Sequence, residues 1–421
     1  MMRLWSDSIS KVEKVFIWFI FVTHVYFIYR YPFKYGSAST SGTYSSTPFI
    51  FKLGKYLIVL LMEAYVLVRY TLSPYKVTLS RGQKIIIFFI VLFASYVSFS
   101  SVLNIGSGIG IISFVVETTF FIPLLLFFAF FLNKREYFYT EIIFYSYAYH
   151  LFYSLVQVVL YVMVGRLPNI AYAGGFARFG GGWDTPNAFG MFIILPFVLS
   201  LALHRHQRRA LLKVIILTTP ILILLTISLT ATAVFIGAFG LFLLLSRRWN
   251  QLFVGVFFLA GGVAAAIATP GIYDLIVAVI EAKSESIAAH QESLDLVKYL
   301  GGHNVFELLG GGVGDQVFSE STYVYVLSNF GVFGFLVLSL IIGLSVINGI
   351  FKINTARRYS PRRADLFAAY VTYVIAFAIG AINLPFFSIF PVNVYFWFSV
   401  IMIWFMPATS DVEKQVSTVP A

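Results

Sequence analysis

The stretch KIIIFFIVLFASYVSF, residues Lys84–Phe99, decides the fold class, because apolar residues fill it almost without a break. A second run at Ile111–Leu132, IISFVVETTFFIPLLLFFAFFL, has the same character, and such runs recur along nearly the whole chain. A membrane core about 30 Å thick needs about 20 apolar residues for each helical crossing. With 59% hydrophobic residues, the chain is predicted to be an all-α polytopic membrane protein.

We expect about twelve transmembrane helices in a single membrane domain that covers residues 1–421. The predicted spans are residues 14–30, 53–72, 84–103, 111–132, 141–164, 187–203, 212–229, 231–246, 252–269, 330–351, 365–383 and 391–406. A large outer loop with short helices, residues 270–329, separates the ninth and tenth spans. No small-residue cleavage site follows the first apolar run, so we expect that run to stay as the first span.

The distribution of positive charge sets the expected orientation. The formal net charge is +11, and cytoplasmic loops of membrane proteins are enriched in Lys and Arg. With the N-terminus inside, 21 of the 29 Lys and Arg residues fall on the inner side and 8 on the outer side. Both termini are therefore predicted to be cytoplasmic, and no nucleic-acid partner is needed to explain the charge. The outer set is Arg30, Lys34, Lys52, Lys55, Arg166, Arg178, Lys283 and Lys298.

The sequence gives little indication of a metal site or of thiol chemistry. The chain has no cysteine, which excludes disulfides and thiolate metal sites. Its six histidines show no zinc-binding spacing. We expect no metal and no cofactor.

The outer loop Arg166–Asn187, RLPNIAYAGGFARFGGGWDTPN, is the first candidate for a functional site. Five glycines surround Arg178, and glycine lets the backbone adopt positive φ and approach a ligand closely. An arginine just above the membrane suits a phosphate by its charge and its fork of donors. The alternative is an interfacial arginine that pairs with lipid phosphates. Pro186 and Asn187 form a start signal for the next span.

The second outer loop, Pro270–Asn329, contains a predicted helix at Glu281–Leu300 with one apolar stripe. His290 and Lys283 share that stripe, so both are expected to face the protein or the membrane. Two interpretations of His290 stay open, a functional residue and a buried histidine satisfied by a backbone group.

The end of this loop places a carboxylate at the start of a helix. The glycines at 310–312 and 314 indicate a tight turn, and Glu320 precedes a predicted short helix, Ser321–Phe330, that runs into the tenth span through Gly331. Glu320 either accepts a proton from a hydroxyl or binds a sugar, or it only caps the helix N-terminus with its charge.

Three motifs together resemble a known family. They are R-F-G-G-G-W-D-T-P-N-A-F-G at 178–190, a tight turn at S-L-T-A-T-A (228–233), and L-L-G-G-G-V-G followed by E-S-T-Y-V-Y-V-L-S-N-F-G-V-F-G at 308–334. Over roughly Arg166–Leu340 the chain resembles the bacterial O-antigen polymerase and O-antigen ligase superfamily. The resemblance implies a membrane fold of the glycosyltransferase-C type, no metal, and undecaprenyl-pyrophosphate-linked glycans as donors at the periplasmic face.

The resemblance also assigns roles to residues. Arg178 matches the family's arginine before the P-N span. Glu320 stands where ligases usually show a histidine of an H-N pair and many polymerases show an acid, which makes it the leading base, with His303 second. The donor-binding set implied in this way is Arg178, Lys298, His290 and Asn187.

Two departures from the family pattern concern the phosphate-binding set. The family's S-R-G at the tight turn is replaced by Leu229–Thr232, and loop 270–329 contains no arginine. The positive charge that this arginine would supply is left to His290, Lys298 or His303.

The expected function is therefore that of a polymerase of the bacterial inner membrane, which joins lipid-linked repeat units into O-antigen, capsular or exopolysaccharide chains. A ligase that moves the polymer to lipid A core or another acceptor is the rival within the family. A lipid-linked oligosaccharide flippase or other transporter is the rival from another class. Besides the donor and membrane lipids, a chain-length regulator and a flippase of the same pathway are the expected partners.

Polar residues within spans are costly and therefore informative. Glu63 lies midway along the second predicted span, and we assign it to substrate binding. One face of the fifth span carries His150, Tyr153, Gln157 and Tyr161. They either line a groove for the lipid pyrophosphate or glycan, or make hydrogen bonds between helices.

Overall fold

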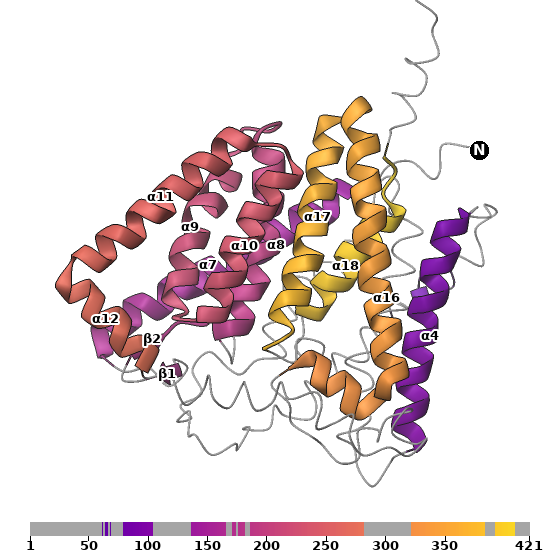
Figure 1. Ribbon diagram of the computed structural model, residues 1–421, viewed down its shortest axis with the longest axis horizontal. Coiled ribbons are helices and arrows are strands. Elements are labelled where there is room, and N and C mark those ends of the chain that lie inside the picture. Colours follow the sequence, from indigo (N-terminus) through magenta and orange to yellow (C-terminus); the bar gives the residue numbers. More distant parts are fainter. Residues whose placement is uncertain are drawn as a thin grey trace, which may run out of the picture.

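A computed structural model describes residues 61, 64–65, 68, 79–103, 136–165, 171–173, 176–181, 186–281, 321–383 and 392–408, most of which are helical (Figure 1). The extended helices are α4 (Arg81–Leu103), α7 (Glu136–Val164), α8 (Pro186–His204), α9 (Ala210–Leu225), α10 (Leu229–Leu245), α11 (Trp249–Ala268), α12 (Pro270–Glu281), α16 (Thr322–Tyr359), α17 (Pro361–Gly380) and α18 (Val392–Phe405). Strands β1 (Ala171–Ala173) and β2 (Phe176–Arg178) form a two-stranded sheet.

The described helices confirm the all-α membrane class. Five of them, α4, α7, α8, α16 and α17, are long and apolar enough to cross a membrane by length and composition, and α9, α10 and α18 are apolar but shorter. Every one of these helices, and α11, coincides with a predicted span. The spans predicted at 14–30 and 111–132 lie outside the described residues, and so does most of 53–72. The number of crossings and the sidedness stay predictions.

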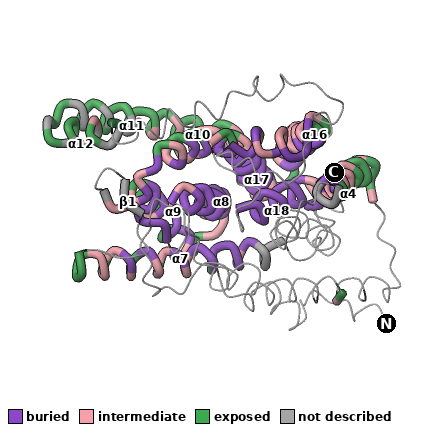
Figure 2. The backbone as a smooth tube through the Cα atoms, turned by 90° about the horizontal axis from the view of Figure 1, so that it is seen from below, coloured by how far each residue is buried: buried purple, intermediate pink, exposed green. Residues whose placement is uncertain are grey.

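The centre of the bundle is formed by α8, α17 and α18 (Figure 2). Of the residues in the most apolar 18-residue stretch of α8, 89% are buried by protein, against 22% in the corresponding stretches of α4 and α7. A helix that is apolar all round is suited to such a central place. Its Phe192 stacks on Tyr395 of α18, with ring centroids 4.9 Å apart.

Two glycines allow central helices to approach closely. A Cβ atom on Gly190 of α8 would overlap Ala231 of α10, and one on Gly349 of α16 would overlap Val371 of α17. Small residues at helix contacts are a recurrent packing device in membrane proteins, where apolar burial between helices gives little driving force.

Helix α16 is bent at Gly331, where the sequence predicted that a short helix runs into the tenth span. Gly331 has φ 62° and ψ −173°, a conformation open essentially only to glycine. The segment before Gly331 forms a short separate helix, visible at the lower end of α16 in Figure 1. The predicted helix Ser321–Phe330 is therefore confirmed.

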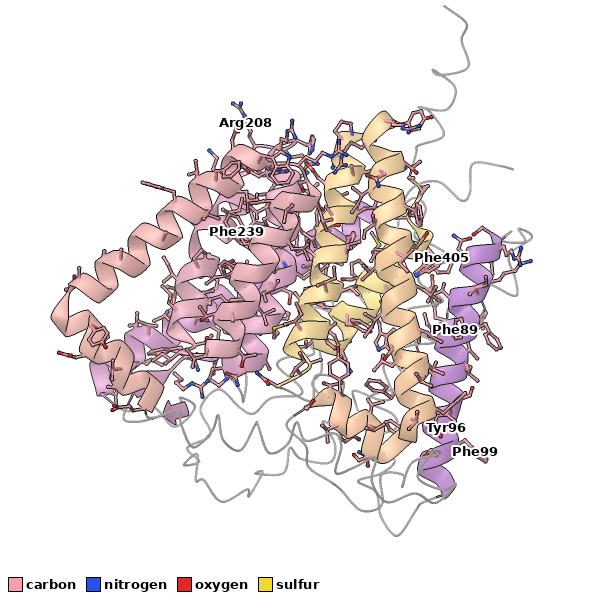
Figure 3. All side chains as sticks on the ribbon, viewed as in Figure 1. Phe89, Tyr96, Phe99, Arg208, Phe239 and Phe405 are labelled. Carbon is pink, nitrogen blue, oxygen red and sulfur yellow. The ribbon has the colours of Figure 1, made fainter. Side chains whose placement is uncertain are left out.

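The described Lys and Arg residues separate between the two ends of the bundle. We call one end the basic end. It contains the loops after α8, α10 and α16 and the starts of α4 and α17. Arg208 lies at this end, far from Tyr96 and Phe99 (Figure 3). The other end carries the β1–β2 hairpin and Arg178. This division matches the two sets of cations predicted from sequence. The cations at the basic end are Arg81, Lys84, Arg205, Arg208, Arg209, Lys213, Arg247, Arg248, Lys352, Arg357, Arg358, Arg362 and Arg363.

Two details correct the sequence prediction, and a third agrees with it. The region after residue 269 was expected to be a loop with short helices, and it begins with one, α12, whose Pro270 suits a first helical turn. The glycine-rich loop contains the β hairpin, which was not expected. The turn between α9 and α10 lies at residues 226–228, slightly before the predicted place, because Ser228 caps α10 by accepting from the Ala231 N–H at 3.1 Å.

Candidate functional site

The β1–β2 hairpin positions Arg178 beside the turn between α9 and α10. The strands are antiparallel, with Ala171 opposite Arg178. The backbone N–H of Phe179 donates to Leu225 O at 3.0 Å, which fastens the end of β2 to the end of α9. The backbone at Arg178 is therefore fixed by its pairing with β1 and by the bond of the next residue, Phe179, to the end of α9.

The guanidinium of Arg178 is fixed by two neutral oxygens. Its Nε donates to Thr226 O at 3.0 Å, and its Nη2 donates to Asn187 Oδ1 at 2.7 Å. An arginine has five N–H donors, so these two bonds leave most of the fork available. The predicted pair Arg178 and Asn187 is thus brought together by the fold.

Two helix ends of opposite polarity adjoin this guanidinium. Asn187 lies in the first turn of α8, whereas Thr226 is the C-cap of α9. The carbonyls of a helix C-terminus suit the arginine itself, while a helix N-terminus carries partial positive charge and unpaired N–H groups. Together with Arg178, the N-terminus of α8 makes this a region suited to an anion.

The charge of Arg178 is not neutralised by any carboxylate that the structure describes. The described acids with placed side chains are Glu141, Asp274, Glu281 and Asp365, and the ion pairs among the described residues involve other cations. Burial lowers the pKa of the Arg178 guanidinium, but an arginine stays protonated at any physiological pH. Arg178 is therefore a half-buried cation without a described counter-ion.

The turn that holds Arg178 has an unusual backbone. Ile227, between Thr226 and Ser228, has φ 44°, although a β-branched residue disfavours this left-handed region. Such conformations cluster at functional sites. Nearby, Gly181 has φ 56°, and a Cβ there would overlap the ring of Phe189, which confirms the expectation of positive φ among these glycines.

Helix α7 packs against the segment that follows Arg178. His150 is fully buried, and its Nδ1 lies 2.8 Å from Gly181 O. Tyr161 contacts Phe179 edge to face, with ring centroids 5.6 Å apart. His150 therefore joins α7 to the loop at Gly181, a structural contact that differs from the hydrogen bond between helices that was one of its two interpretations.

The residues that follow α17 bond to the starts of both α16 and α10. Thr322 N donates to Ala381 O at 2.8 Å, and Asn383 Nδ2 donates to Thr230 Oγ1 at 3.3 Å. These bonds link the residues just after position 320 to the first turn of α10. The predicted site residues Glu320, His303, Lys298, His290 and Glu63 themselves lie outside the described residues.

Sequence reasoning missed Thr226 and Ile227 as parts of this site. The predicted span 212–229 included both residues. Thr226 acts through its backbone carbonyl, which any residue type offers, so only the exact position of the turn would have revealed it. The S-L-T-A-T-A motif was the available signal, and it lies two residues too late.

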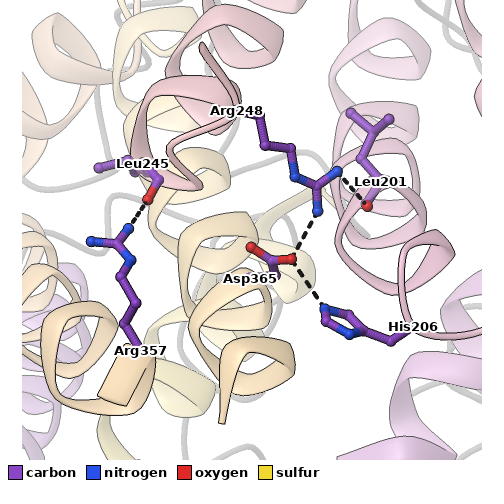
Figure 4. Close-up of polar contacts among 6 residues, drawn as sticks. All are labelled: Leu201, His206, Leu245, Arg248, Arg357 and Asp365. Carbon is purple, nitrogen blue, oxygen red and sulfur yellow. Dashed lines mark hydrogen bonds and ion pairs between the residues drawn. The ribbon is translucent and has the colours of Figure 1, made fainter. Parts of the chain in front are cut away.

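Several polar groups at the basic end bond to one another (Figure 4). Asp365 Oδ2 accepts from Arg248 Nη2 at 2.8 Å and lies 3.2 Å from His206 Nε2, while Arg248 Nη1 donates to Leu201 O at 3.1 Å. Arg357 donates to Leu245 O. These contacts tie α8, α10, α16 and α17 together and leave no obvious binding function.

A cavity of about 290 Å³ also lies at the basic end. Its Arg209 pairs with Glu141 at 2.7 Å, so that charge is balanced within the cavity itself. Its lining is Thr140, Glu141, Phe144, Leu203, Gln207, Arg209, Leu212 and Arg362. Arg178 at the opposite end is the better candidate for an anion.

Within the described part of the chain, no three residues among His, Cys, Asp and Glu gather closely enough to hold a metal ion. In sequence comparison, no protein family and no curated protein matches this chain.

Proposed function

We propose that this protein is a metal-independent polysaccharide polymerase of the bacterial inner membrane. It joins undecaprenyl-pyrophosphate-linked oligosaccharide repeat units at the periplasmic face, with a membrane fold of the glycosyltransferase-C type. Arg178 binds the pyrophosphate of the donor. The motifs at 178–190 and 308–334 support this assignment.

One observation carries the proposal, namely the placement of Arg178. The guanidinium is anchored by the neutral oxygens of Thr226 and Asn187, lies beside the first turn of α8, and has no carboxylate partner among the described residues. A cation fixed but not neutralised is what electrostatic stabilisation of a developing negative charge requires. Two phosphates of a lipid pyrophosphate suit the remaining donors of the fork.

The proposed reaction follows from these groups. An acceptor hydroxyl oxygen attacks the anomeric carbon of the donor sugar, and the bond from that carbon to the pyrophosphate oxygen breaks with its electron pair. Arg178 stabilises the negative charge that gathers on the leaving undecaprenyl pyrophosphate. The hydroxyl proton passes to a base, for which Glu320 is the proposed residue because it precedes Ser321 at the same end of the bundle. We expect inversion at the anomeric carbon.

The apolar character of α8 favours an enzyme over the rival transporter. A transporter for charged lipid-linked glycans needs polar or charged groups along a central pathway. The buried residues of the central helix α8 are apolar except Ser200, although α17 and α18 also bury polar side chains such as Thr372, Tyr373 and Asn393.

The decisive experiment supplies the purified protein with lipid-linked repeat units and nothing else. A polymerase makes a ladder of glycan lengths, because the repeat unit serves as both donor and acceptor. A ligase gives a product only when lipid A core or another acceptor is added. A flippase gives no new glycosidic bond but moves the lipid-linked glycan across a proteoliposome membrane. Either of the last two results would overturn the proposed function.

A further inference from the structure

Gln157 of α7 is a buried amide that the protein leaves unsatisfied. The residue is 4% exposed. Neither its Oε1 nor its Nε2 has a hydrogen-bond partner among the residues that the structure describes. A buried amide without partners is unfavourable, and within a membrane-crossing helix such a residue is a candidate for function.

Helix geometry gives the direction in which Gln157 faces. At about 100° per residue, positions 150, 157 and 161 lie within about 40° of one another on the helix. Positions 150 and 161 both touch the segment after Arg178, because His150 contacts Gly181 and Tyr161 contacts Phe179. Gln157 lies between them and therefore faces the Phe179–Gly181 segment as well.

The neighbours of Gln157 on this face differ from it. The Nδ1 of His150 is bonded to Gly181 O, and Ser154 Oγ donates to His150 O at 2.8 Å within its own helix. Both have structural bonds inside the protein. Gln157 differs because neither polar atom of its amide is bonded to the described protein.

We propose that Gln157 binds a sugar of the lipid-linked donor through a pair of neighbouring hydroxyl groups. This inference rests on the proposed function. A carboxamide offers an acceptor and a donor, and both are unsatisfied here. A phosphate at physiological pH offers almost only acceptor oxygens and would leave Oε1 unpaired, whereas vicinal hydroxyls both donate and accept.

The position next to Arg178 agrees with this choice. Arg178 and Phe179 are adjacent in the chain; Arg178 reaches Thr226 and Asn187, whereas Phe179 reaches Tyr161 of α7. The glycan begins at the pyrophosphate, so a donor held by Arg178 extends its sugars past this segment. The partly exposed ring of Tyr161, which packs on the buried Phe179, supplies the apolar surface on which a sugar ring rests.

The test uses Gln157→Leu and Gln157→Met, which keep the size of the side chain and remove its polar atoms. Binding to the purified protein in nanodiscs is measured with two probes, undecaprenyl pyrophosphate and the undecaprenyl-pyrophosphate-linked repeat units extracted from the native membranes. We expect both variants to bind the glycan-linked probe about tenfold more weakly or worse and to bind undecaprenyl pyrophosphate like the wild type. Arg178→Ala should weaken the binding of both probes.

Thermal unfolding separates a binding role from a structural one. Removing an unsatisfied buried amide should raise Tm by about 1–3 °C, so loss of binding would accompany a gain in stability. Thr372→Val is the matched control, because the buried Thr372 hydroxyl of α17 also has no partner among the described residues. It should raise Tm and leave both affinities unchanged.

The outcomes are distinct. Unchanged affinity of Gln157→Leu for the glycan-linked probe would overturn the inference, as would equal losses for both probes or a fall in Tm, which would indicate a structural partner or a bound water. Undiminished binding of both probes by Arg178→Ala would instead contradict the proposed function, whatever the Gln157 variants do.

Discussion

The guanidinium of Arg178 and the amide oxygen of Asn187 lie 2.7 Å apart, and this bond joins the β hairpin to the first turn of α8. Asn187 could be replaced by aspartate with almost no change in shape, and a carboxylate would anchor the arginine more strongly. A neutral acceptor instead holds the guanidinium in place while its charge stays available to a ligand.

Asn187→Asp should therefore reduce donor binding while leaving the hairpin in place. The new carboxylate would pair with Arg178 and compete with the donor pyrophosphate. We expect polymer formation to fall by about tenfold or more, with Tm equal to or above that of the wild type. Asn354→Asp is the matched control, since Asn354 also accepts from an arginine, Arg357, but at the basic end. Equal activity in both variants would argue against an anion at Arg178.

Glu320→Gln separates a catalytic base from a helix cap. Glutamine keeps the size of the side chain but cannot take a proton at neutral pH. If Glu320 is the base, turnover should fall by about 10²-fold or more with unchanged protein abundance. If it only caps the helix that follows, the substitution should cost roughly 1 kcal/mol of local stability and spare activity. Glu281→Gln, at the exposed end of α12, serves as the control. A near-normal Glu320→Gln enzyme would shift the role of base to His303.

The bend of α16 gives a prediction about stability. Gly331→Ala should destabilise the fold by about 1–3 kcal/mol, because alanine disfavours φ 62°. Gly343→Ala, in the straight part of the same helix, meets no atom within 4 Å and should stabilise by up to about 1 kcal/mol. Thermal unfolding in detergent compares the two. Similar Tm values would contradict the glycine requirement at the bend.

The network at the basic end should be structural. Asp365→Asn leaves the buried Arg248 without its anion, and we expect a loss of about 3–5 kcal/mol. The exposed pair of Arg209 and Glu141 provides the contrast, because Glu141→Gln should cost about 0–1 kcal/mol. Chemical unfolding measures both. A loss of activity in Asp365→Asn at full stability would give this network a function that its geometry does not suggest.

The sequence predicted most of the described helices because a long apolar run that crosses a membrane forms a helix, which satisfies its own backbone hydrogen bonds. Apolar length and a Pro start predicted α8, apolar length predicted α10, and the glycines before the tenth span marked the short helix at 321–330. The sequence did not predict the bend at Gly331 or the strands Ala171–Ala173 and Phe176–Arg178. Segments of three residues are too short to show a period.

The candidate site was predicted in part for a related reason. Arg178 and Asn187 stood out by residue type, and the fold joins them. Thr226 contributes only its backbone carbonyl, which every residue type has, so its residue type did not reveal this role. Gln157 and His150 shared one face in the sequence, yet only the structure shows that His150 Nδ1 bonds to Gly181 O while the amide of Gln157 bonds to no described residue.

The central claim is that Arg178 binds the donor pyrophosphate, and substitution of this residue tests it most directly. Lengths of glycan made from lipid-linked repeat units are compared for the wild type, Arg178→Ala, Arg178→Lys and the exposed control Arg208→Ala. We predict no ladder for Arg178→Ala, a weak one for Arg178→Lys because lysine keeps the charge but lacks the fork, and a normal ladder for Arg208→Ala, at equal protein levels. A full ladder from Arg178→Ala would contradict the account.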